Sequence, residues 1–137
     1  MNLIASPKSV LLLNAGLDVL HEQSNEWLSE IAFWRDETAF FYALVVEKTL
    51  TAVPIAARET IEEIENALVS LTGGELEELQ KAVEQHENYL GYLLETNPDH
   101  DGNYREKHKL LEMKFKELER RFRKLKSEIF DLVKMSK

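Results

Sequence analysis

The chain has no cysteine among its 137 residues. This absence excludes disulfide bonds, thiolate metal sites and cysteine nucleophiles. Long hydrophobic runs are also absent, since the longest one near the N-terminus, Val10–Leu13, is far too short to cross a bilayer. A secretory signal is not expected, because Pro7 and Gly16 are among the residues that keep the first twenty residues from forming a longer apolar stretch. We therefore expect a cytoplasmic protein without a membrane span.

Positive charge is in the minority, with 17 Lys and Arg against 25 Asp and Glu and a net charge of −8. Phosphate binding relies on a cationic surface, so nucleic acid is not an expected partner. Glutamates gather in residues 59–95, whereas Lys and Arg gather in residues 114–137. The simplest explanation places the basic last helix against acidic neighbours in the same molecule. The alternative is an external acidic partner or a membrane surface.

The spacing of apolar residues indicates an all-α protein, because apolar positions recur every three or four residues and no strand pattern competes. Helices are predicted at about residues 24–50, 55–71, 75–95 and 103–133. Ser24 or Asn25 would cap the first helix, Pro54 would precede the second, and Gly73-Gly74 would end it. Short connections make successive helices antiparallel, so we expect one domain over residues 1–137, an up-down-up-down four-helix bundle.

Each predicted helix carries an apolar stripe whose narrow seam is typical of coiled-coil-like packing. The stripes are Trp27, Ile31, Trp34, Thr38, Phe41 and Val45; Ile61, Ile64, Leu68 and Leu71; Leu76, Leu79, Val83, His86, Leu90 and Leu93; and Tyr104, His108, Leu111, Phe115, Leu118, Phe122, Leu125, Ile129 and Leu132.

The last helix is predicted to be longer than the third, so its end would project past the Gly73-Gly74 turn. Ile129, Phe130 and Val133 would then be exposed unless something covers them. The N-terminal segment, residues 8–20, is rich in leucine and valine, and we expect it to fold over this projection. A dimer interface at the projecting end is the alternative.

Two histidines fall on inward positions of the third and fourth helices, at equal distances from the turn centred near Asn97. His86 and His108 should therefore share one layer of the core. Buried imidazoles need partners, so the layer is either a structural pair that fixes helix register or a metal site. The metal hypothesis adds Glu65 and Glu112 as ligands, and this ligand set suits iron or zinc.

The His-rich layer resembles hemerythrin-like and ferritin-like bundles, in which His and Glu from facing helices hold a metal centre. The resemblance is architectural, because Val83 and Arg105 stand where a di-iron bundle has the glutamate of Glu-x-x-His. The segment Trp27–Tyr42, with Trp34-Arg35-Asp36-Glu37 at its centre, together with His86-Glu87 and His108, resembles small bacterial helical proteins. That resemblance implies a four-helix bundle and assigns no activity.

The first helix carries more aromatic residues than one seam needs, including Phe33 and Phe40. Either this helix is the most buried, or its surplus forms a pocket or a subunit contact. No nucleophile–base pair, phosphate loop or cofactor fingerprint is present, so neither an enzyme nor a cofactor is expected. We expect a protein-interaction or structural module, able to self-associate, with a contact surface of Phe33, Phe40, Arg120, Arg121 and Arg123. The alternative function is a metal-binding bundle centred on His86 and His108.

Overall fold

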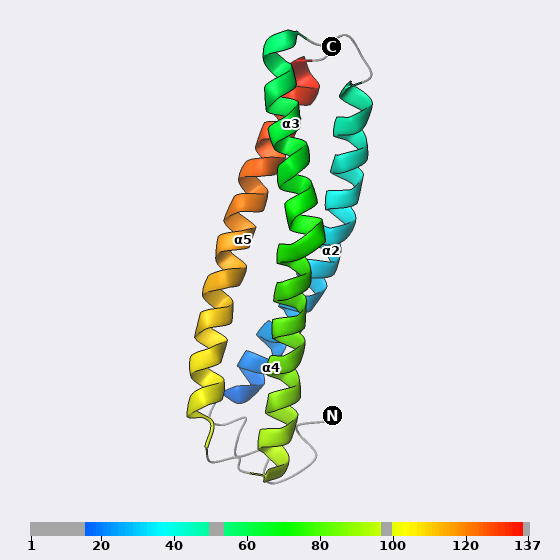
Figure 1. Ribbon diagram of the computed structural model, residues 1–137. Coiled ribbons are helices and arrows are strands. Elements are labelled where there is room, and N and C mark those ends of the chain that lie inside the picture. Colours follow the sequence, from blue (N-terminus) through cyan, green and yellow to red (C-terminus); the bar gives the residue numbers. More distant parts are fainter. Residues whose placement is uncertain (1–15, 50–53, 97–99, 136–137) are drawn as a thin grey trace. The chain divides into compact units, whose positions relative to one another are not determined.

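A computed structural model describes residues 16–49, 54–96 and 100–135 (Figure 1). Its elements are the α-helices α2 (Leu17–Thr49), α3 (Ile55–Ser70), α4 (Leu76–Thr96) and α5 (Gly102–Met135), with a π-helix η1 (Leu71–Glu75) between α3 and α4. The described residues contain no strand, which confirms the all-α prediction. Within these same ranges, no helix has an apolar stretch long enough to span a membrane.

Backbone contacts divide the chain into two compact units. Unit 1 takes the chain up to Ile31 together with Leu79–Phe115, and unit 2 takes Ala32–Glu78 together with the chain from Lys116 onward. Each unit therefore draws on three helical stretches, and each is described here by itself. The single domain over 1–137 stays a prediction.

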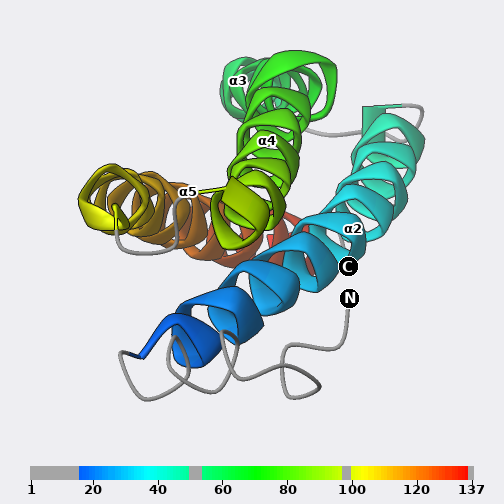
Figure 2. The ribbon, with the colours of Figure 1, turned by 90° about the horizontal axis from the view of Figure 1, so that it is seen from below.

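Unit 1 consists of the first part of α2, most of α4 and the first part of α5. Figure 2 shows these three stretches side by side, with none of them lying between the other two. At the end of the unit Leu17 packs with Leu90, Leu93, Leu94 and Tyr104, and Leu20 and Tyr89 cover this cluster.

Unit 2 consists of the rest of α2, α3 with η1 and the first residues of α4, and the rest of α5. Trp34 contacts Phe122 and Phe41 contacts Phe130 between α2 and α5, with ring centroids 5.8 and 5.9 Å apart. Arg121 of α5 forms an ion pair with Glu75 of η1. This pair agrees with the expectation that the basic last helix lies against acidic residues of the same molecule.

The predicted apolar stripes are confirmed, since all of their residues are buried. The stripe of α2 begins earlier than predicted, however. The helix starts at Leu17, directly after Gly16, whose φ of 88° is the only positive φ among the described residues. Ser24 is fully buried inside the helix and does not cap its start. The reason is that Leu17, Leu20 and Ser24 continue the same three-and-four spacing toward the N-terminus.

The predicted turn at Gly73-Gly74 is wrong, because α3 continues through η1 into α4 (Figure 1). Neither glycine has a positive φ. The apolar stripe steps by five residues from Leu71 to Leu76, and the backbone N–H of Leu76 donates to the carbonyl of Leu71. A π-turn takes up one extra residue, so the stripes on both sides stay on one face. The described residues thus form three continuous helical stretches, and the second turn of the predicted bundle, at Gly73-Gly74, is absent.

Replacing Gly74 with alanine is expected to raise the free energy of unfolding by about 0.5–1 kcal/mol, because alanine favours helix and loses less entropy on folding. A Cβ at this position would meet no atom within 4 Å. Urea unfolding of Gly74→Ala measures the change. Gly16→Ala is the matched control and is expected to destabilise, because its φ is positive. A destabilised Gly74→Ala would show that the chain turns at this glycine.

The predicted exposed end of the last helix is also corrected. Ile129 and Leu132 are buried within unit 2, where α2 contacts α5, while Phe130 is half exposed. The predicted covering segment comprises residues 8–20, and its part up to Ala15 lies outside the described residues. Its described part belongs to unit 1, where Leu17 and Leu20 pack on α4 and α5. The absent turn explains the first correction, since α3 and η1 continue beyond the start of α4 and belong to the same unit as this end of α5. The earlier start of α2 explains the second, since Leu17 and Leu20 are part of this helix.

Candidate functional site

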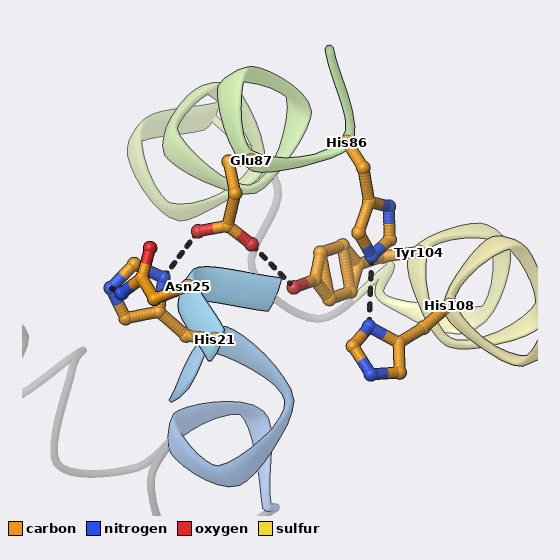
Figure 3. Close-up of polar contacts among 6 residues, drawn as sticks. All are labelled: His21, Asn25, His86, Glu87, Tyr104 and His108. Atoms are coloured by element: carbon orange, nitrogen blue, oxygen red, sulfur yellow. Dashed lines mark hydrogen bonds and ion pairs between the residues drawn. The ribbon is translucent and has the colours of Figure 1, made fainter. Parts of the chain in front are cut away.

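Polar side chains meet in the core of unit 1, at positions that the helical period assigns to the apolar stripe. His86 of α4 and His108 of α5 are each only 3% exposed. His86 Nε2 lies 3.0 Å from His108 Nδ1, which is hydrogen-bonding distance (Figure 3). The predicted layer is therefore confirmed. Two residues equidistant from one turn meet because antiparallel helices advance by equal steps on either side of it.

Gln23 determines which ring nitrogen of each histidine carries the hydrogen, because it ends the row of hydrogen bonds that starts at His86 and passes through His108. His108 Nε2 lies 2.8 Å from Gln23 Oε1, an amide oxygen that can only accept. His108 Nε2 therefore donates to Gln23, and the neutral ring accepts at Nδ1. His86 Nε2 donates to that nitrogen in turn. As neutral rings, both thus carry their hydrogen on Nε2.

This arrangement leaves His86 Nδ1 as a lone pair in the core, with no hydrogen-bond partner. Burial lowers the pKa of His86 to about 4, and the nearby His108 and Lys107 act in the same direction. Burial also lowers the pKa of His108, while the charge of Glu112 opposes this effect. At neutral pH the pair is therefore uncharged, as a group cut off from water must be unless it is paired with an opposite charge.

Aromatic rings enclose the histidine pair. Tyr104 stacks on His86 with centroids 4.1 Å apart and planes 9° apart. Trp27 stacks on His108 at 4.6 Å and contacts Phe115 at 5.7 Å. The rings exclude water from the two imidazoles and hold both at a fixed orientation.

A second polar group joins the layer through Tyr104, whose side chain is fully buried. Its hydroxyl donates to Glu87 Oε1 at 3.4 Å, and the other carboxylate oxygen of Glu87 pairs with His21 Nδ1 (Figure 3). Burial raises the pKa of Tyr104, and the charge of Glu87 adds to the effect. Asn25 Nδ2 donates to His21 Nε2 at 3.3 Å, so His21 Nδ1 carries the hydrogen that Glu87 accepts.

The sequence analysis did not predict the pairing of His21 with Glu87. Gln23 was missed as well. His21 lies one turn before the buried Ser24 position and four residues before Asn25. A correct start for α2 would have placed both His21 and Gln23 on this helix, beside the stripe.

The four predicted metal ligands are not gathered into one cluster. Glu65 belongs to unit 2, and Glu112 lies one turn beyond His108 on α5. Among the described residues, no group of three or more His, Asp or Glu side chains is arranged to hold a metal ion. The facing nitrogens of the two histidines, His86 Nε2 and His108 Nδ1, bond to each other instead.

The predicted contact surface lies in unit 2 and is exposed in part. Phe33 and Phe40 on α2 are 60% and 64% exposed. The three arginines of α5 are engaged with acidic residues: Arg120 with Glu117, Arg121 with Glu75 and Arg123 with Glu119.

No protein-family model matches the chain, and no curated protein or solved structure matches it. The resemblance to small bacterial helical proteins and to metal-holding bundles therefore stays a prediction.

Proposed function

We propose that the protein is a helical interaction module that associates with a second copy of itself through the outer face of α2. The observation that carries this proposal is the exposure of Phe33 and Phe40, at 60% and 64%. They are seven residues apart, so they lie on the same side of the helix. This side differs from the stripe that fills the core of unit 2.

Water contact at two large aromatic rings is costly, and removing them from water supplies a driving force for association. Leu44, only partly exposed, follows Phe40 by four residues and extends the same row. A row with steps of seven and four residues is suited to packing against another helix. The same row on a second copy can fill it, because a two-fold dimer brings identical patches together.

The histidine layer supports this module by fixing how α4 and α5 pack within unit 1. Buried polar pairs favour one register, because any other register leaves their nitrogens unsatisfied. The role that we propose for this pair is structural.

Replacing both phenylalanines, Phe33→Ser with Phe40→Ser, is expected to weaken self-association at least tenfold, since about 1.4 kcal/mol of lost burial already gives that factor. Sedimentation equilibrium of the wild type and the variant measures the change. Met113→Ser is the matched control, because Met113 is an exposed apolar residue of unit 1. A wild type that stays monomeric at all accessible concentrations would contradict the proposal, as would equal effects of the variant and its control.

The alternative function is metal binding at His86 and His108, with iron or zinc. The observation that favours it is the buried lone pair of His86 Nδ1, which has no hydrogen-bond partner. Elemental mass spectrometry of the purified, untagged protein tests it. Stoichiometric metal that is lost in His86→Ala would support the alternative, and its absence after metals are added back would exclude it.

A further inference from the structure

A pocket of about 420 Å³ lies in unit 1, between α2 and α4, next to the His21–Glu87 pair. Its apolar lining comes from Leu28 of α2 and from Leu90 and Leu94 of α4. Pockets that take small molecules begin at about 300 Å³ and combine an apolar lining with a few polar groups. This pocket has both properties.

Gly91 lines the pocket from α4. A glycine inside a helix costs about 1 kcal/mol relative to alanine, so it needs a reason at this position. Close packing is not the reason, because a Cβ here would meet no atom within 4 Å. Its φ is not positive either. What the missing side chain does provide is space inside the pocket.

The polar lining consists of acceptors and amides. Glu84 and Glu87 bring two carboxylates from α4, and His21 lies beside them with its Nε2 accepting a hydrogen bond from Asn25. Asn25 and Asn88 complete this side (Figure 3 shows His21, Asn25 and Glu87 together). No lysine or arginine is among the described residues that line the pocket. A ligand rich in hydrogen-bond donors and positively charged fits such a lining.

We propose that this pocket binds a small aliphatic amine, with the ammonium group at Glu84 and Glu87 and the hydrocarbon part on Leu28, Leu90 and Leu94. Gly91 leaves room for the hydrocarbon part. Glu87 is held in place by His21 on one oxygen and by Tyr104 on the other, so it is oriented before the ligand arrives. Neither Phe33 nor Phe40 lines the pocket, so the test of the site does not depend on self-association.

The probes are n-butylamine, charged at neutral pH, and n-butanol, which has the same carbon chain without the charge. Amide chemical shifts in ¹H–¹⁵N spectra report binding at Asn25, Asn88 and Gly91. We expect butylamine to shift these three amides with saturation and butanol to bind at least tenfold more weakly. Absence of saturable shifts with butylamine would overturn the proposal, and equal binding of butanol would overturn the assigned class of ligand.

Two variants locate the site. Gly91→Leu is expected to stay folded, because its Cβ meets open space and leucine favours helix, and to abolish the shifts. Glu84→Gln is expected to weaken binding about threefold, as for an exposed charge pair. Glu62→Gln removes the same charge from an exposed position of unit 2 and should leave binding unchanged. Full binding by a folded Gly91→Leu would contradict the proposed site.

Discussion

Acidification from about pH 7 to about pH 4.5 is expected to cost about 2–3 kcal/mol of folding free energy through His86 alone, because its pKa lies near 4 in the folded chain and near 6.5 when unfolded. The neutral ring is the form that the folded core accepts. Below pH 6.5 the unfolded chain binds a proton that the folded chain does not, so stability falls as the pH falls toward 4. The stability that depends on a neutral His86 is fully present above pH 6.5.

Charged and titratable groups around the pair modulate this loss. From α5, His108 and Lys107 disfavour a charge on His86, whereas Glu112 favours one on His108. From α4, Glu87 reaches the layer only through Tyr104. From α2, the neutral amide of Gln23 is the partner. The hydrogen bonds given above for the two rings join them to each other and to the neutral amide of Gln23, so none of these bonds favours the charged form of either ring.

Urea unfolding at a series of pH values measures this effect. The double variant His86→Gln with His108→Gln keeps amide groups in the layer and removes both titrations. Its free energy of unfolding should depend less on pH than that of the wild type between about 6.5 and 4, by up to about 1.4 kcal/mol per pH unit for one proton. Parallel curves for the two proteins would show that the histidines do not titrate with folding.

Each single substitution, His86→Ala or His108→Ala, is expected to destabilise the protein by about 2–3 kcal/mol at neutral pH. Both changes leave a cavity in the core and break the bond between the rings. His86→Ala also removes the stacking on Tyr104, and His108→Ala removes the stacking on Trp27 and the bond to Gln23. Both substitutions break the same hydrogen bond, so their losses of stability should not be additive.

A double-mutant cycle measures that coupling. We expect the double alanine variant to be about 1–2 kcal/mol more stable than the sum of the single effects predicts. His100→Ala is the matched control, since His100 is exposed, and it should change stability by less than about 0.5 kcal/mol. Additive single effects would mean that the two rings do not interact in solution.

Much of the helical core could be predicted from the sequence, because a buried helix face repeats at a fixed period. On α5 the stripe from Tyr104 to Leu132 keeps this period and is buried throughout. The helix boundaries were harder to predict, because a serine or a glycine can stand at a helix end or inside a helix. Ser24 is as suitable for a cap as for a small core residue, and Gly73 and Gly74 are compatible with a turn as well as with a π-helix. Burial decides between them, since Ser24 is buried in unit 1 and both Leu71 and Leu76, on either side of the glycines, are buried in unit 2.

The candidate site could be predicted only as far as its inward positions. Counting from the turn near Asn97 brings His86 and His108 together, as the structure confirms. Gln23, His21 and Glu87 flank the stripes, and whether a flanking side chain reaches inward depends on its length and rotamer rather than on its spacing. The hydrogen bonds of these three residues could therefore be identified only from the structure.

The central claim is that His86 and His108 form a neutral, directly hydrogen-bonded pair in the core. Long-range ¹H–¹⁵N spectra of the histidine rings, recorded while the pH is lowered from about 8 to about 5, test it most directly. We expect His86 to remain neutral, with the hydrogen on Nε2, well below pH 6.5, and burial lowers the pKa of His108 in the same direction. Protonation of His86 and His108 near pH 6.5, with rapid exchange between ring nitrogens, would contradict this claim.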